Sequence, residues 1–215
     1  MSHKVHPTGY RLGVNVNWSS RWFDMKKYPV RLCEDVAIRE YLTKKLRGAG
    51  LERVEIERTQ NKITVIIYTS RPGIIIGRSG SGAEVLNKDI MRAIYKANKS
   101  VPEVKIEVRE VRNPEFFASL VGLSIAEQIE KRMPFRRVMK RTIERVMANK
   151  SVKGIKVALA GRLGGAEMAR REWLKDGVMP RNTLRSEIDF SIQEAYTTYG
   201  VIGIKVWIYK GQKLE

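Results

Sequence analysis

A glycine-rich segment, residues 71–82, carries the residue types best suited to hold an anion. It reads Arg-Pro-Gly-Ile-Ile-Ile-Gly-Arg-Ser-Gly-Ser-Gly. Glycine lets the main chain approach a bulky group closely and present its N–H groups to it, and Arg78 adds a positive charge between two of the glycines. The anion that fits such a loop is phosphate, so the question is which phosphate-containing molecule it holds.

The flanking residues predict that this loop joins a strand to a helix. Residues 62–69 are dense in β-branched and aromatic side chains, which predicts a strand buried on both faces. From Leu86 to Ala97, apolar residues recur at the helical period. Because the N–H groups at a helix N-terminus lack partners within the helix and the helix dipole favours negative charge there, the position suits a phosphate.

Three classes of phosphate-binding loop compete for this segment. The nucleotide-binding P-loop needs Gly-x-x-x-x-Gly-Lys-Ser/Thr, but here the glycine spacing is one residue short and Arg78 replaces the lysine. The dinucleotide fingerprint would start at Gly80 and would place Val85 where its third glycine belongs. The Gly-x-x-Gly clamp of KH domains, which holds RNA backbone, fits Gly77, Arg78, Ser79 and Gly80. An isolated match of this kind is more often an ordinary turn, so the order of the surrounding elements has to decide.

That order is typical of a KH domain. From Glu34 to Ala49, apolar residues share one face, which predicts a helix. Residues 53–58 and 104–109 alternate apolar with charged side chains, which predicts two further strands. The expected sequence is helix, strand, strand, glycine loop, helix, strand, and we therefore predict a KH domain of type II, the class that begins with its helix.

Asn113 and Pro114 mark the expected domain boundary, because proline disfavours a helix in the residue before it and suits the first turn of the next one. The predicted division is an N-terminal arm of residues 1–33, a KH domain of residues 34–112 and a second domain of residues 113–215.

The second domain is expected to pack two helices against a mostly antiparallel sheet. One helix follows Glu115 and another starts at Pro134, while residues 154–159, 188–193 and 203–208 alternate as strands do. Both domains are therefore predicted to be α+β.

The helix that starts at Pro134 carries the strongest charge signal in the chain. Residues 131–145 hold seven basic residues and one acidic residue, Glu144. At about 100° per residue, the apolar side chains of this helix fall on one side and the basic ones on the other. Because like charges one turn apart repel, we expect RNA phosphate to neutralise this face, in preference to the alternative that it is simply solvated. The residues assigned to this basic site are Arg132, Arg136, Arg137, Lys140, Arg141 and Arg145.

The composition also points to a polyanionic partner. The 215 residues include 41 Lys and Arg against 23 Asp and Glu, a formal net charge of +18. This excess favours nucleic acid over the alternative of an anionic membrane surface, since no apolar run approaches the ~20 residues of a spanning helix. The first residues contain no apolar stretch typical of a signal peptide, so we expect a cytosolic protein without a membrane partner.

The sequence offers little for catalysis or metal binding. Cys33 is the single cysteine, and His3 and His6 are the only histidines, which makes neither a zinc set nor a Ser/His/Asp arrangement. A phosphate-handling enzyme would need the P-loop spacing, and a nuclease would need paired carboxylates near the basic helix, where Glu144 is isolated. We predict no enzyme, no cofactor and no metal site.

Several longer runs together resemble the bacterial S-three family of small-subunit ribosomal proteins, in the family's order and over essentially the whole chain. These runs are residues 4–13, 73–80, 134–141, 151–157, 161–170 and 197–208. The resemblance implies a structural constituent of the head of the small ribosomal subunit that binds ribosomal RNA and lines the messenger RNA entry channel. The alternative is a free-standing RNA-binding regulator built on a KH domain.

The resemblance also implies particular partners and contact residues. Arg136, Arg137 and Lys140 take the positions of an Arg-Arg-x-x-Lys run that faces messenger RNA in the family and helps to open downstream structure. The neighbouring proteins that it implies are S-ten and S-fourteen in the head, and S-four and S-five at the entry pore. Ser79 stands where family members often have a second cation, which predicts a weaker grip by the glycine loop. Further candidates for ribosomal RNA contacts are Lys4, Arg11, Arg21, Arg162, Arg170, Arg171 and Arg185.

Overall fold

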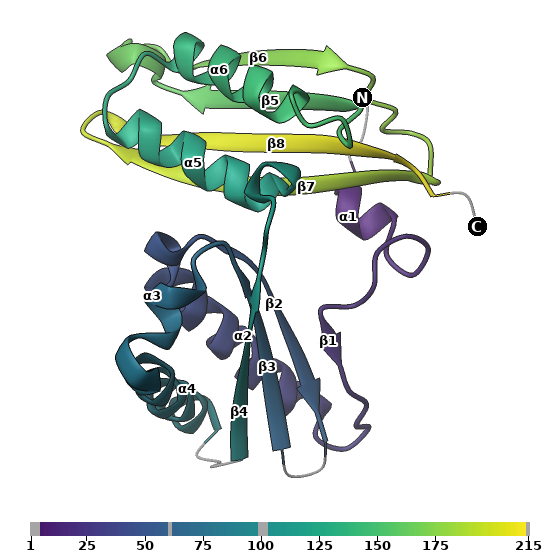
Figure 1. Cartoon of the computed structure of the whole chain (residues 1–215), viewed down its shortest axis with the longest axis vertical. Coiled ribbons are helices and arrows are strands. Elements are labelled where there is room, and N and C mark those ends of the chain that lie inside the picture. Colours follow the sequence, from purple (N-terminus) through teal and green to yellow (C-terminus); the bar gives the residue numbers. More distant parts are fainter. Residues whose placement is uncertain (1–4, 60–61, 99–102, 214–215) are drawn as a thin grey trace. The chain divides into compact units, whose positions relative to one another are not determined.

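The computed structural model describes residues 5–59, 62–98 and 103–213, and the chain divides into two compact units (Figure 1). The first unit is residues 18–112, and the second combines the chain from Asn113 onward with its first 17 residues. The N-terminal segment is thus shared between the units, whereas the sequence suggested one arm of residues 1–33. Within the described part of the chain, no helix has the length and apolar character needed to cross a bilayer.

The first unit is a four-stranded sheet with helices on one face (Figure 1). Strands β2 and β3 pair antiparallel, whereas β1 with β2 and β3 with β4 pair parallel, in the order β1-β2-β3-β4. The elements are β1 (Ser20–Arg21), α2 (Tyr28–Lys45), β2 (Leu51–Arg58), β3 (Lys62–Thr69), α3 (Pro72–Ile76), α4 (Ser81–Asn98) and β4 (Glu103–Glu110), with 3-10 turns at Arg47–Ala49 and Arg78–Gly80. This order confirms the predicted arrangement.

Two details of the first unit differ from the predictions. Helix α2 begins at Tyr28, six residues before Glu34, because Pro29 sits in its first turn, where proline is well tolerated. Part of the segment expected to be a loop is the short helix α3, which also has proline in its first turn and ends at Gly77.

The core of the first unit lies between the sheet and helices α2 and α4. Alternate residues of β2 and β3 face these helices, whose own apolar stripes recur at the helical period. The fully buried members are Ile38, Leu42, Ile56, Val65, Ile67, Ile90 and Ile94. On the other side of β3, Ile66 is buried while Thr64 and Tyr68 are half-buried, so the strand is shielded on both faces, as predicted.

The second unit places two helices on one face of an antiparallel sheet (Figure 1). The strand order is β6-β5-β8-β7, and every neighbouring pair is antiparallel. The elements are α1 (Pro7–Tyr10), α5 (Ala118–Glu130), α6 (Phe135–Met147), β5 (Gly154–Gly161), β6 (Arg170–Gly177), β7 (Ser186–Thr197) and β8 (Gly200–Gln212), with 3-10 turns at Pro114–Phe116 and Leu163–Gly165. Strand β6 was not predicted.

The core of the second unit is sandwiched between the sheet and helices α5 and α6. Its fully buried members include Ile125, Val138, Ile155, Val157, Leu159, Ile204, Val206 and Ile208. Helix α5 approaches β7 so closely at Gly122 that a Cβ there would lie 2.8 Å from Cγ of Gln193. Because the apolar side of α6 is packed in this core, its opposite side faces away from the sheet and can carry charge.

Candidate nucleic-acid interface

The predicted RNA clamp lies at the junction of α3 and α4. Gly77 (φ 68°) and Gly80 (φ 83°) adopt left-handed backbone conformations that side chains with a Cβ rarely adopt. The Ser81 hydroxyl donates a hydrogen bond to the Arg78 carbonyl at 2.9 Å, and the Arg78 side chain is exposed. The clamp is therefore a defined turn with an accessible cation. The side chain of Ser79 lies outside the described part of the structure.

Exposed apolar side chains flank this clamp, which the sequence did not identify as contact candidates. Ile74 and Ile76 on α3 and Val85 on α4 are 59%, 43% and 53% exposed. A hollow of about 260 Å³ opens between the end of α2 and these two helices, next to Ile74 and Val85. The signal for them in the sequence was the run of three isoleucines, residues 74–76, because a helix as short as α3 cannot bury three consecutive apolar side chains. They offer apolar surface for a base next to a backbone clamp.

Helix α6 separates its charges from its apolar side chains as predicted. Val138, Met139, Ile143 and Val146 are buried against the sheet, together with Thr142. The basic residues Arg136, Arg137, Lys140, Arg141 and Arg145 are all exposed.

Ion pairing divides these basic side chains into two groups. Arg136 donates two hydrogen bonds of 3.2 Å to the Glu172 carboxylate on β6, which raises the pKa of Arg136 and lowers that of Glu172. Arg145 lies 3.8 Å from Glu115. Within residues 5–59, 62–98 and 103–213, no carboxylate pairs with the three remaining cations, which we call the α6 triad: Arg137, Lys140 and Arg141. The triad therefore carries uncompensated charge on one rigid helical face.

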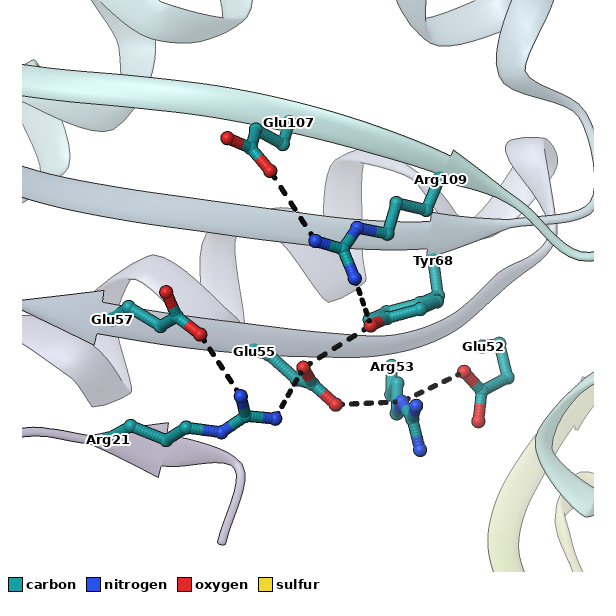
Figure 2. Close-up of polar contacts among 8 residues, drawn as sticks. All are labelled: Arg21, Glu52, Arg53, Glu55, Glu57, Tyr68, Glu107 and Arg109. Carbon is teal, nitrogen blue, oxygen red and sulfur yellow. Dashed lines mark hydrogen bonds and ion pairs between the residues drawn. The ribbon is translucent and has the colours of Figure 1, made fainter. Parts of the chain in front are cut away.

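Figure 2 shows a contrasting surface, the face of the first sheet that carries no helix. Arg21 on β1 pairs with Glu55 and Glu57 on β2, each at 3.1 Å. Arg53 lies 3.2 Å from Glu55, and its guanidinium carbon is 4.4 Å from the centre of the Tyr68 ring. The charges here are neutralised within the protein.

The same pattern continues across β3 and β4. Arg109 donates a hydrogen bond to the Tyr68 hydroxyl at 3.2 Å and lies 3.6 Å from Glu107 (Figure 2). Glu107 also accepts a hydrogen bond of 2.8 Å from Lys105, and this bond is the main reason why the pKa of Glu107 is lowered. We call this surface, from Arg21 to Arg109, the paired face of the KH sheet.

Comparison with known proteins assigns families to both units. The model of the ribosomal protein S3 C-terminal domain matches residues 125–208, and that of the KH domain matches residues 37–116. The small ribosomal subunit protein uS3 of Maridesulfovibrio salexigens is 53% identical over 216 residues, which cover 100% of this chain and 98% of the relative. The uS3 proteins of Oleidesulfovibrio alaskensis and Myxococcus xanthus are 51% and 49% identical, and the alignments cover 100% of this chain and 98% and 94% of the relatives.

The chain belongs to the uS3 family. This membership confirms the resemblance found in the sequence, and the KH match confirms the α+β fold. Among the residues that the structure describes, no group of three or more His, Cys, Asp or Glu is placed to hold a metal ion.

One cation expected to contact RNA in this uS3 family member is instead part of the protein interior. Arg11 is 1% exposed, and its guanidinium donates hydrogen bonds of 2.6–3.1 Å to main-chain carbonyls. The acceptors are Pro7, Arg181, Thr183 and Ser186. Because its donors are taken and its charge is enclosed, Arg11 cannot reach an RNA phosphate, and its role is to fix the N-terminal segment onto the second unit. This corrects the prediction for Arg11.

Of three more residues predicted to contact RNA, two are placed differently by the structure and one lies outside the described residues. Arg132 is not on α6 but in the turn between α5 and α6, where it adopts a left-handed conformation (φ 60°) with an exposed side chain. Arg21 is compensated by two glutamates, so the structure does not support it as a phosphate contact. Lys4 lies outside the described residues.

The remaining candidates lie near β6 and the loops of the second unit. Arg162 donates a hydrogen bond of 3.0 Å to the Ala166 carbonyl, and Arg170 lies 3.3 Å from Glu172. Arg171 and Arg185 are exposed. Arg162, Arg170 and Arg171 lie at the same end of the β5–β6 pair, whereas Arg185 precedes β7; all four stay predictions.

Proposed function

We propose that this protein is an RNA-binding structural constituent of the small ribosomal subunit, and that its α6 triad holds messenger RNA as it enters the ribosome. The broader part follows from membership of the non-enzymatic uS3 family, whose members are named small ribosomal subunit proteins, and from the KH domain. The finer part is supported by one observation, the exposed and uncompensated charge of Arg137, Lys140 and Arg141.

The physics of the triad suits a moving strand. Side chains three and four residues apart on a helix are about 5–6 Å apart, so the three cations can contact neighbouring phosphates together. Contacts to phosphate do not depend on the base sequence. Each contact replaces a counterion on the RNA, and it can form and break without any covalent change. A messenger can therefore be held and still advance. Arg136 shares its charge with Glu172, so it contributes less than the family motif implies.

The KH clamp supplies the second RNA contact in this proposal, with ribosomal RNA as its ligand. On the same basis, the neighbours in the subunit would be S-ten and S-fourteen in the head, and S-four and S-five near the entry pore. The proposal places the protein on ribosomes in the cytoplasm.

Replacing Arg137, Lys140 and Arg141 together by alanine tests the role of the triad. We expect the variant to enter small subunits normally in sucrose gradients, because the buried face of α6 is untouched, but to slow translation through a stable messenger hairpin. A matched control replaces the exposed α4 cations Lys88, Arg92 and Lys96 by alanine, which removes the same charge elsewhere. Normal passage by the α6 variant, or equal slowing in both, would refute the messenger contact. Protein that stays at the top of the gradient would instead favour the free-standing regulator.

Gly80 allows a sharper test of the clamp. A Cβ at Gly80 would meet nothing within 4 Å, and asparagine and aspartate tolerate left-handed backbone equally well. Gly80→Asp should therefore weaken binding of ribosomal RNA fragments more than Gly80→Asn, since the two differ only in charge. Equal affinities would show that the clamp does not contact phosphate.

A further inference from the structure

The second sheet has a face that α5 and α6 do not cover and that the α6 triad and the KH clamp do not use. Helices α5 and α6 cover one side of this sheet (Figure 1). Because side chains alternate along a strand, every second residue of β5 to β8 faces the other way. We call this other side the open face, and its exposed members of interest are Arg171, Trp173, Lys175, Ile192, Tyr196 and Lys205.

Among the residues that the structure describes, α1 covers one end of the open face. There, α1 packs on β7, the His6 ring lies 4.9 Å from the Phe190 ring, and Trp207 is buried. Beyond this end, large apolar side chains are exposed: Trp173 is 54% exposed and Ile192 is 51% exposed. Trp173 and Ile192 lie on the two edge strands, and an exposed indole ring beside cations is a platform on which a base can stack.

The register of the strands gives this face a low floor. Trp173 on β6 is opposite Ala158 on β5, and the next outward pair on these strands is Arg171 with Ala160. Ala160 in turn is opposite Gly203 on β8. Ala158 is itself buried, so the open strip of small residues is formed by the exposed Ala160 and the half-buried Gly203 on neighbouring strands, beside which Trp173 stands higher. A flat base can lie on such a strip against the indole ring.

The charge on the open face is strongly positive. Lys156 on β5 is directly opposite Lys175 on β6, so two basic side chains are neighbours on this face. The Lys156 ammonium lies 4.5 Å from the centre of the Trp173 ring, which holds the indole in place. Within the described ranges, no carboxylate pairs with Arg171, Lys175 or Lys205.

We propose that the open face binds a single-stranded segment of RNA, with a base stacked on Trp173 and phosphates held by Arg171, Lys175 and Lys205. Four-stranded sheets with exposed aromatic side chains bind unpaired RNA in this way, and basic residues beside such rings track the backbone. RNA is favoured over a protein partner by charge complementarity, because no carboxylate in the described ranges pairs with these three cations and each can contact a phosphate. The proposal rests on the protein being an RNA binder, and it adds a third RNA contact, on the side of the second sheet opposite α6.

Binding of a fluorescein-labelled 12-nucleotide oligouridine to the full chain, followed by anisotropy, tests this proposal. The parent protein carries alanine at the α6 triad, so that a failure of the messenger contact does not affect the result. Trp173→Ala should weaken binding at least about fivefold, whereas Trp173→Phe should keep most of the affinity because it retains an aromatic face. The control is Trp18→Ala, which removes another exposed tryptophan in the first unit and should change affinity less than about twofold.

Unchanged affinity in Trp173→Ala, or no binding by the parent, would overturn the proposal. If Trp173→Ala disturbs β6, Lys205→Gln carries the test: the salt dependence of log affinity should lose about 0.7 of its slope, and an unchanged slope would also overturn it. In purified small subunits, ultraviolet crosslinking should join Trp173 to RNA. Carboxylate-to-lysine crosslinks that join Lys175 and Lys205 to another protein would show that the open face is a protein contact instead.

Discussion

The two sheets of this protein share an architecture but present opposite electrostatics on their helix-free faces. The paired face of the KH sheet balances five cations with five glutamates, namely Arg21, Arg53, Lys62, Lys105 and Arg109 with Glu52, Glu55, Glu57, Glu103 and Glu107. The open face of the second sheet has Lys156, Arg171, Lys175 and Lys205, with Glu194 as its acidic residue in the described strands. A four-stranded sheet with helices on one side therefore does not specify a ligand.

The difference arises from neighbours across the strands. On the KH sheet, opposite charges face each other, as where Lys62 on β3 is paired in register with Glu103 on β4 at 3.2 Å. On the second sheet, Lys156 faces Lys175. Cross-strand pairs of opposite charge stabilise a sheet, and like pairs destabilise it. The first face therefore holds its charges in pairs within the protein, whereas in the described ranges no carboxylate pairs with Arg171, Lys175 or Lys205 on the second.

The largest effect is expected from the residue that closes one end of the open face. Arg11→Met should lower the free energy of unfolding of the second unit by about 2–4 kcal/mol, because four main-chain carbonyls, one in a buried and three in partly buried hydrogen bonds, lose a charged donor. Hydrogen exchange should become faster in β7 and β8 and stay unchanged in β2 and β3. The control Arg185→Met removes an exposed cation and should have little effect. Unchanged exchange in β7 would mean that the open face does not depend on this anchor.

Matched charge reversals test the comparison directly. Arg171→Glu with Lys205→Glu on the open face should reduce the slope of log affinity for oligouridine against log salt by about 1.4, since each lost phosphate contact accounts for about 0.7. Lys105→Glu with Arg109→Glu on the paired face changes the net charge equally but removes cations that are already compensated. We expect no change in slope there. Equal changes in both variants would mean that total charge, rather than its pairing, controls RNA binding.

The smallest effect is expected from the pH dependence of stability on the paired face, through Glu107. A hydrogen bond from Lys105, and more weakly the charge of Arg109, keep the pKa of Glu107 below its ordinary 4.5. A carboxylate with a depressed folded-state pKa stabilises the fold above its unfolded pKa, and this stability is lost as the pH falls through the depressed value. Lys105→Met should raise the pKa of Glu107 toward 4.5, as measured by carboxyl NMR titration, and should flatten acid destabilisation. Lys175→Met on the open face is the control. A Glu107 pKa that stays depressed in Lys105→Met would assign the shift to Arg109.

Local patterns in the sequence were sufficient for much of the fold and for the separation of charged and apolar side chains on α6. The charged and apolar faces of α6 follow from a 3.6-residue period within a single helix, and the KH order follows from alternation and glycine spacing. Each of these patterns is made by residues that are close together in the sequence.

The features that sequence reasoning missed depend on distant residues. Strand β6 reads Arg-Arg-Glu-Trp-Leu-Lys-Asp-Gly, which has low strand propensity, and it becomes a strand because its whole length pairs with β5. The burial of Arg11 depends on carbonyls 170 or more residues away, at Arg181, Thr183 and Ser186. No local pattern distinguishes this arginine from a surface cation.

The anchoring of Arg11 has a consequence for the order in which the chain folds during its own synthesis. Residues 5–17 are made before the first unit, yet Ser186, which accepts a hydrogen bond from Arg11, is 175 positions after Arg11 in the chain. The first unit, residues 18–112, is continuous in sequence and can fold as soon as it emerges. Residues 5–17 therefore cannot make their contacts with residues 181–186 while the KH domain folds. These contacts form only after β7 has been synthesised.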